Sequence, residues 1–213
     1  LPILVRFAQS QNQSQGRSVS LLYATNTLGG VIGVLISAFL LIELFGLQNS
    51  LLLAVAINLS IGALASFIKT RDQNLTIKKV QNLQLTKIMT IDKFIVLLAF
   101  FASGLIAIAY EVLWSRIFTP TIGTLIYAFA TVLAIYILGI GIGSLAYGHF
   151  AKIIKGKNLA FAICEAGIGV FAIASIILTH NFVIDNSFRI AVIVLPATIL
   201  MGLTFPVVVA LIS

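Results

Sequence analysis

The stretch SGLIAIAYEVLWSRIFTPTIGTLIYAFATVLAIYILGIGIGSLAYG, residues 103–148, decides the fold. It contains two apolar runs and carries the only tryptophan of the chain, a glutamate among apolar residues and the densest run of glycines. About 20 apolar residues are needed to cross the hydrocarbon core of a bilayer. The stretch therefore predicts two membrane-spanning helices joined by a short turn.

The composition places the whole chain in a membrane. Of 213 residues, 60% are hydrophobic and only 9% are charged, whereas about 25% of the residues of a soluble domain are charged. So few charges cannot cover a water-facing surface, and the lipid bilayer is the expected partner. The formal net charge of +7 is better explained by basic loops beside anionic lipid than by nucleic acid. One cysteine, Cys164, excludes an internal disulfide and fits a small core residue.

The hydropathy pattern predicts about six spans. Pro196 and Pro206 are expected to kink the last of them, because neighbouring helices can satisfy the freed carbonyl groups. The hydrophilic stretch 69–93 is expected to be a linker, for which a membrane-surface helix and a plain loop fit equally well. The expected spans cover residues 20–45, 51–68, 94–118, 122–150 and 159–178 and a segment from about 190 onward, with a turn at 46–50.

The basic residues support this map if both ends of the chain are cytoplasmic. The outer face then carries only Arg116 and Arg189, and the other eleven of the thirteen Lys and Arg residues lie inside. The positive-inside rule fits this distribution. The inner residues are Arg6, Arg17, Lys69, Arg71, Lys78, Lys79, Lys87, Lys93, Lys152, Lys155 and Lys157.

The two ends of the chain indicate an internal repeat. The chain starts with Leu1 rather than Met and stops within an apolar segment at Ser213, so we expect a piece of a longer protein. LPILV, with Pro2, resembles TFPVVV, with Pro206. Residues 1–68 would then end a first membrane repeat, 69–93 would be a cytoplasmic linker, and 94–213 would begin a second repeat with four spans.

Glu111, in AIAYEVLWSR near the outer end of the third span, is the first candidate for chemistry. A charged side chain at mid-membrane costs about 2.5–3.5 kcal/mol on insertion scales and less near the interface. Glu111 is either part of a substrate or proton site with Tyr110 and Arg116, or an interfacial glutamate paired with Arg116 or with a backbone donor. Residues five apart do not share a helix face well. Tyr110 and Trp114 fit an aromatic belt equally well.

Glu165, in FAICEAGIGV, is placed about two turns into the fifth span. It is either a protonatable interior site or a hydrogen-bonded packing glutamate. Glu43, near the outer end of the first span, is expected to be interfacial. Asn26 and Asn58 are expected to form interhelical hydrogen bonds, and Asn26 is also a candidate for the substrate or proton site.

The glycines of the fourth span fit helix packing. Gly141, Gly143 and Ala146 match GxGxxA, but a dinucleotide-binding loop needs a preceding strand. Small residues four apart let helix backbones approach closely. The pairs with this spacing are Gly139 with Gly143, Ser144 with Gly148, and Gly29 with Gly33.

The sequence predicts no catalytic residue, no metal site and no cofactor in this piece. His149 and His180 are placed at membrane edges, far apart, and neither belongs to a cluster of metal-ligand residues. No set of side chains with the pattern of a hydrolase triad, a phosphate-binding loop or a nucleic-acid-binding module is visible.

Four separated motifs support a family resemblance: GRSVSLLYATNTLGGVIG, YEVLWSR, IYAFATVLAIYILGIGIGS and LPATILMGLTFPVVV. Together they resemble bacterial spermidine synthase-like membrane proteins, in which a major-facilitator-like domain is fused to spermidine synthase. The resemblance implies a fragment of a major-facilitator-like helical bundle in the cytoplasmic (inner) membrane. Many members add a cytoplasmic Rossmann-like domain that transfers an aminopropyl group to an amine such as putrescine. No part of that domain is recognisable here, so no catalytic residue carries over.

Three functions are consistent with these observations. In the first, the chain anchors a spermidine synthase-like enzyme and moves a polyamine or related molecule across the membrane. In the second, it belongs to a stand-alone transporter of the major-facilitator type, with halves related by an axis along the membrane normal. In the third, it is a purely structural anchor, which has no use for interior carboxylates.

Overall fold

The computed structural model describes residues 15–67, 91–150, 156–181 and 186–212, and these ranges contain helices and no strand. Long apolar helices were expected, and this expectation is confirmed. They fit an integral membrane protein. Pro2 and nearly all of the expected linker 69–93 lie outside the described residues. Within these described ranges, five segments are long and apolar enough to cross a membrane: Ala24–Phe67, Phe94–Ile122, Leu125–His149, Lys157–Asn181 and Ser187–Leu211.

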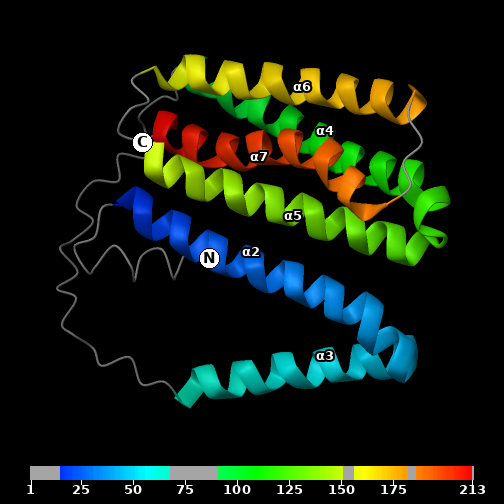
Figure 1. Ribbon diagram of the computed structural model, residues 1–213. Helices are drawn as coiled ribbons and strands as arrows, with labels where there is room; N and C mark the ends of the chain where they lie inside the picture. The colour runs from blue at the N-terminus through cyan, green and yellow to red at the C-terminus, as the bar shows by residue number, and fades with distance from the viewer. Residues whose placement is uncertain (1–14, 68–90, 151–155, 182–185, 213) are drawn as a thin grey trace.

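The first of these segments folds back on itself. It comprises α2 (Gln15–Ile36), the π-helical turn η1 (Ser37–Leu41) and α3 (Ile42–Phe67). Gly46 interrupts α3 with φ 74° and ψ 171°, a conformation that glycine adopts without steric cost. Figure 1 shows α3 running back toward the other end of the bundle after this point and diverging from α2. The turn predicted at 46–50 therefore begins at its first residue, and the helix resumes directly after it.

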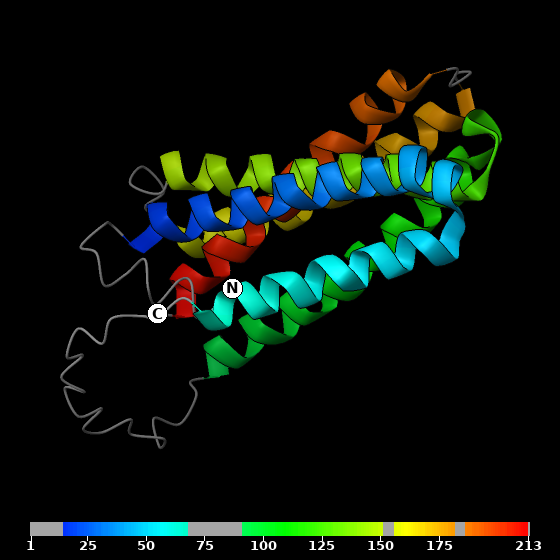
Figure 2. The ribbon, with the colours of Figure 1, turned by 90° about the horizontal axis from the view of Figure 1, so that it is seen from below.

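The opening stretch forms the expected helical hairpin. α4 (Ile91–Ile122) and α5 (Leu125–Phe150) are joined by a tight turn in which Gly123 has φ 101°. The Gly123 amide donates to the Thr119 carbonyl at 2.9 Å, which satisfies one terminal carbonyl of α4. This turn and the α2–α3 turn lie at the same end of the molecule (Figures 1 and 2).

α5 lies at the centre of the bundle. It contacts α7 (Ser187–Ile212), α2 and α4, while α6 (Lys157–Asn181) packs on α7. α7 stays helical through Pro196 and Pro206. α3 contacts mainly the adjoining η1 and exposes most of its side chains within the described part of the chain.

Three glycines bring α5 and α7 together. A Cβ at Gly139 would lie 1.9 Å from Thr198 Oγ1, and one at Gly143 would lie 2.0 Å from the Ile199 carbonyl oxygen. From the other side, a Cβ at Gly202 would lie 2.2 Å from the Ile140 carbonyl oxygen. A larger residue at any of these three positions would clash with the facing helix, and the packing role predicted for Gly139 and Gly143 is confirmed.

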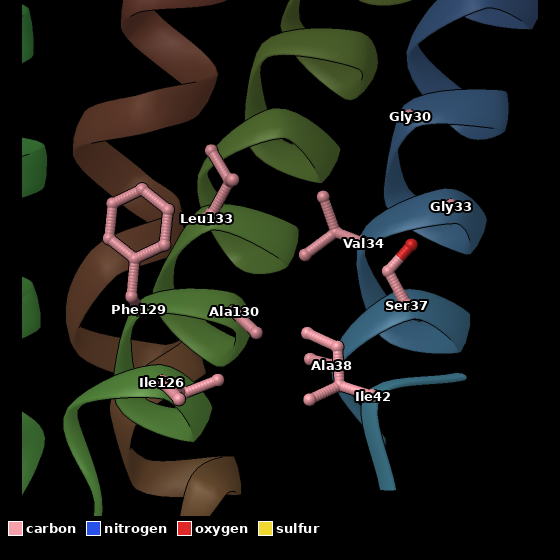
Figure 3. Close-up of a pocket in the computed structure, with 10 residues that line it drawn as sticks. All are labelled: Gly30, Gly33, Val34, Ser37, Ala38, Ile42, Ile126, Phe129, Ala130 and Leu133. Atoms are coloured by element: carbon pink, nitrogen blue, oxygen red, sulfur yellow. The ribbon is translucent and has the colours of Figure 1, made fainter. Parts of the chain in front are cut away.

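The same prediction is wrong for Gly29 and Gly33. No atom lies within 4 Å of the position that a Cβ would take at either residue. The reason is the orientation of α2, which turns Gly30 instead toward Ile137 of α5. Gly33 borders a shallow apolar groove between α2 and α5 (Figure 3).

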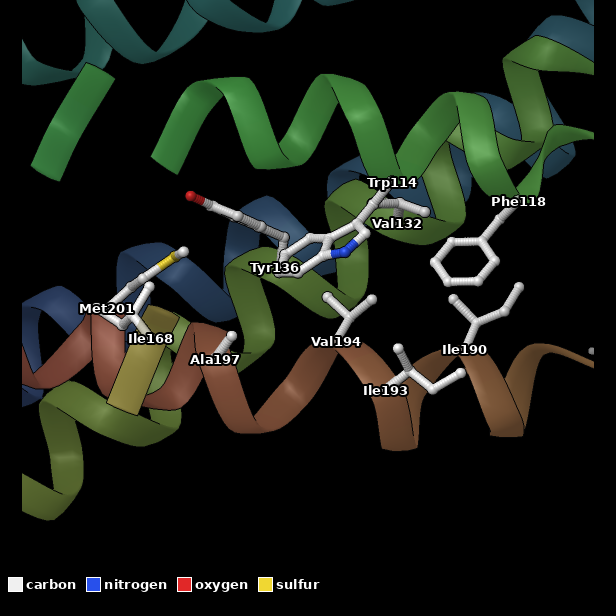
Figure 4. Close-up of a cluster of buried hydrophobic side chains, with 10 residues drawn as sticks. All are labelled: Trp114, Phe118, Val132, Tyr136, Ile168, Ile190, Ile193, Val194, Ala197 and Met201. Carbon is white, nitrogen blue, oxygen red and sulfur yellow. The ribbon is translucent and has the colours of Figure 1, made fainter. Parts of the chain in front are cut away.

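The hydrophobic core lies where α4, α5, α6 and α7 meet (Figure 4). Trp114 is only 2% exposed, stacks on Tyr110 at 5.5 Å and meets Tyr136 edge-on. The aromatic-belt alternative is therefore wrong for Trp114, because its indole ring is buried among helices. The core residues are Trp114, Phe118, Val132, Tyr136, Ile168, Ile190, Ile193, Val194, Ala197 and Met201.

Candidate functional site

One face of α4 carries the polar groups of the candidate site. Ser103, Ala107, Tyr110, Trp114 and Phe118 follow the helical spacing that places residues on one side. The first three are half-buried and the last two are buried. This stripe is turned toward the core of the bundle.

Glu165 of α6 reaches toward the stripe. Its carboxyl oxygen Oε1 is buried and has no hydrogen-bond partner among the described residues. The side chain of Ser103 hydrogen bonds to the carboxyl group. The backbones of α4 and α6 share few close contacts, so the two helices meet here through their side chains. We call this contact, made by Ser103, Glu165, Trp114 and Ser175, the α4–α6 seam.

A second bridge fixes the register of the seam. The Trp114 indole Nε1 donates to Ser175 Oγ at 3.1 Å, and the Ser175 hydroxyl donates to the Ala172 carbonyl at 2.6 Å. Trp114 follows Ser103 by eleven residues on α4, and Ser175 follows Glu165 by ten on α6. At about 1.5 Å per residue, the two intervals span about 16.5 Å and about 15 Å. The two bridges thus match the parallel course of α4 and α6 in Figure 1.

Glu111 lies beside the same stripe. It is half-buried and follows Ser103 by eight residues, or about 12 Å along the helix axis. Arg116 is exposed, and no ion pair joins it to Glu111 in the part of the chain that the structure describes. Glu111 therefore lies on α4 at the side of the stripe that faces Glu165. The role of Glu111 and Glu165 as substrate or proton sites stays a prediction.

Asn26 does not join this constellation. It is exposed on α2, which packs against α5, and Asn58 is exposed on α3. Within the described ranges, neither side chain hydrogen bonds to another helix. The predicted interhelical hydrogen bonds are therefore absent there, because both residues lie on outward-facing surfaces.

Glu43 belongs to a separate polar pair at the turn end of the bundle. The Tyr127 hydroxyl donates to Glu43 Oε1, and the Tyr127 ring stacks on Phe39 at 5.1 Å. Glu43 itself is exposed. This hydrogen bond ties the start of α3 to the start of α5.

The sequence alone did not reveal the partners in these pairs. Ser103, Ser175 and Tyr127 were not singled out, although each is a polar residue within an apolar span. Ser103 could have been identified from the sequence, because its spacing to Tyr110 and Trp114 places all three residues on one face of α4. Ser175 and Tyr127 carried none, since only the tertiary structure shows which helix each one meets.

The seam offers the chemistry of a carboxyl group and a hydroxyl group in apolar surroundings. Such a pair can exchange a proton or accept hydrogen bonds from an ammonium group. Among the residues that the structure describes, no three His, Cys, Asp or Glu side chains are grouped as metal ligands.

No protein-family profile matches the chain, and no similar curated protein or solved structure was found.

Proposed function

We propose that this chain is the transmembrane domain of a spermidine synthase-like membrane protein and that it moves a polyamine or a related small amine across the membrane. The four motifs that resemble the family support the assignment. The observation that carries the transport role is Glu165, whose Oε1 atom is buried without a hydrogen-bond partner among the described residues.

A purely structural role does not explain why a carboxyl oxygen is buried without a hydrogen-bond donor. Leaving a buried acceptor without a donor costs about 1–3 kcal/mol, and more when the group is charged. Ser103 supplies hydrogen bonding to one side of the carboxyl group only. A transported ammonium group brings several N–H donors and a compensating charge, so the missing interaction is supplied during passage.

Glu111 extends the proposed route. It flanks the same face of α4 about 12 Å from Ser103 along the helix axis, nearer to the α4–α5 turn. An amine that leaves Glu165 along the seam meets this second carboxyl group. Tyr110, stacked on Trp114, precedes Glu111 on α4 and belongs to the same stripe.

The proposal includes a topology with six crossings. The two arms of Ala24–Phe67, which fold back at Gly46, cross the membrane separately in a major-facilitator-like bundle. Both ends of the chain and the stretch 69–93 face the cytoplasm, in a bacterial inner membrane. A cytoplasmic aminopropyltransferase domain elsewhere in the same protein is the proposed partner.

Reporter fusions test this topology. A fusion after Asn49 is expected to report an outside location, and a fusion after Gln81 an inside location, because eleven of the thirteen basic residues then lie inside. Alkaline phosphatase and green fluorescent protein give opposite signals on the two sides and control for each other. The reverse pattern, or the same side for both fusions, would rule out the six-crossing arrangement.

The transport proposal is tested by reconstitution. The purified chain in lipid vesicles is expected to take up a labelled polyamine, whereas a structural anchor leaves uptake at the level of empty vesicles. A stand-alone transporter would behave like the wild-type chain in this assay and would differ only in lacking the enzyme domain.

A further inference from the structure

α7 carries a threonine on the face that it turns toward α4 and α6. The buried apolar residues of this face are Ile190, Val194, Ala197, Met201 and Val208. They follow one another at intervals of four, three, four and seven residues, and Thr204 divides the last interval into three and four. This is the spacing of a single helical stripe. Thr204 is only 4% exposed, and Figure 4 shows Ile190 and Val194 of the same stripe pointing toward Phe118 and Trp114 of α4.

The contact between α4 and α7 places Thr204 close to the level of Ser103. The rings of Phe100 on α4 and Phe205 on α7 lie 6.4 Å apart between centroids, and α7 runs opposite to α4 and α6 (Figure 1). From this ring pair toward the α4–α5 turn, Ser103 lies about 4.5 Å along the bundle axis and Thr204 about 1.5 Å, at about 1.5 Å per residue. The two hydroxyl groups therefore differ in level by about 3 Å.

The contact between α6 and α7 gives the same result for Glu165. A Cβ at Gly167 of α6 would lie 2.6 Å from Leu200 Cδ1 of α7, so these two residues face each other. From this pair in the opposite direction along the axis, Glu165 lies about 3 Å away and Thr204 about 6 Å. Thr204 is thus within about 3 Å of the level at which the Ser103 side chain hydrogen bonds to Glu165.

The three polar side chains lie between two apolar clusters. One is the core described above, and the other comprises Tyr147, Phe161, Val207 and Val208. On each of the three helices the polar residue separates members of the two clusters. The flanking residues are Phe100 and Ala107 on α4, Phe161 and Ile168 on α6, and Met201 and Val207 on α7. Hydrogen bonds are electrostatically stronger in such apolar surroundings than in water, and an alkyl chain has apolar neighbours on both sides.

We propose that Glu165, Ser103 and Thr204 together bind a primary alkylammonium group and that Thr204 makes the site specific for it. The proposal rests on the transport function proposed above and names the class of amine that the route accepts. A primary ammonium group has three N–H donors. Glu165 Oε1 has no hydrogen-bond partner among the described residues.

The two hydroxyl groups supply the remaining acceptors. The Thr204 hydroxyl donates to the Met201 carbonyl at 2.7 Å, and the Ser103 hydroxyl hydrogen bonds to the Glu165 carboxyl group. Each hydroxyl has one donor and two acceptor lone pairs, so both oxygens can still accept a hydrogen bond. Three helices thus offer one acceptor for each N–H donor of the ammonium group. A trimethylammonium group has no N–H donor and gains nothing from this arrangement.

Equilibrium binding tests the site separately from transport. The purified chain in detergent is titrated with labelled 1,4-diaminobutane. Thr204→Val removes the hydroxyl group and keeps the shape of the side chain, and it is expected to weaken binding about tenfold, the lower end of the range for a hydrogen bond to a charged group. Thr204→Ser keeps the hydroxyl group and is expected to bind like the wild type. The diamine with three methyl groups on each nitrogen is expected not to displace the label.

Thr198→Val is the matched control. It makes the same change at a buried threonine of α7 that faces Gly139 of α5, and binding is expected to stay at the wild-type level. Circular dichroism and Trp114 fluorescence check the fold of each variant. Equal affinities of Thr204→Val and the wild-type chain would overturn the proposal, even if the chain transports polyamines. So would displacement of the label by the methylated diamine, or no binding to the wild-type chain. Binding that depends on Thr204 without uptake into vesicles would uphold the site and contradict only the transport function.

Discussion

Glu165→Gln is expected to reduce polyamine flux at least about tenfold while leaving the protein level unchanged. Glutamine has nearly the same shape and can still hydrogen bond to Ser103, but it cannot carry the charge that pairs with an ammonium group or exchange a proton. Hydrogen bonds to charged groups contribute about 1.5–3 kcal/mol, and each 1.4 kcal/mol corresponds to a factor of ten. Flux is measured as uptake or export of labelled polyamine in cells that express each variant.

The chain offers a matched control for this substitution. Glu43→Gln makes the same chemical change at an exposed carboxyl group outside the seam, and flux is expected to stay at the wild-type level. Glu111→Gln is expected to lower flux as well, because it removes the second carboxyl group of the route. Normal flux in both Glu111→Gln and Glu165→Gln would instead favour a structural role for these glutamates.

Gly143→Ala is expected to destabilise the folded bundle by about 3 kcal/mol, at the upper end of the range for overpacking. The new methyl group would lie 2.0 Å from the Ile199 carbonyl oxygen and 3.0 Å from the Gly202 Cα atom. These are backbone atoms, so no rotamer change makes room, and α5 and α7 have to separate. Unfolding is followed in detergent through the fluorescence of Trp114, the only tryptophan, which is buried in the core beside α7.

Gly62→Ala is the control for this prediction. It makes the same substitution at a helical glycine with nothing within 4 Å of the new methyl group, and alanine favours helix over glycine by up to about 1 kcal/mol. Its stability is therefore expected to be unchanged or slightly raised. Equal unfolding transitions for Gly143→Ala and the wild-type chain would show that the α5–α7 crossing is looser than described.

Much of the fold could be predicted from the order of apolar and polar segments. The long apolar helices and the α4–α5 hairpin follow from runs of the length that a bilayer requires. Gly46 stands at the start of the turn predicted at 46–50. Gly123 was placed inside the span predicted at 122–150, but it forms the turn between α4 and α5, and the helix begins only at Leu125. Spacing also identified Gly139 and Gly143 as packing residues.

The sequence does not show which faces of the helices contact one another, for a reason specific to membranes. Lipid-facing and core-facing surfaces are both apolar, so hydrophobicity does not show which side of a helix packs. Gly29 and Gly33 have the spacing of a packing pair and still face open space. Trp114 fits a membrane-surface belt by sequence but lies in the core, where Ser175 accepts its indole hydrogen bond.

The candidate site was predicted in part. Glu165 and Glu111 were identified as costly residues within apolar spans, and the structure places both beside the inward stripe of α4. The partner of Glu165 could not be predicted, since Ser103 meets it only through the parallel register of α4 and α6. Asn26 was grouped with them by polarity alone, and its position on α2 separates it from the seam.

Uptake of a labelled polyamine into vesicles that contain only the purified chain and lipid tests the central claim most directly. We expect saturable uptake by the wild-type chain, wild-type uptake by Glu43→Gln, and uptake by Glu165→Gln close to that of empty vesicles. Correct folding of each variant is confirmed beforehand by the Trp114 fluorescence. Wild-type uptake no faster than that of empty vesicles, or undiminished uptake by Glu165→Gln, would contradict the proposed transport through Glu165.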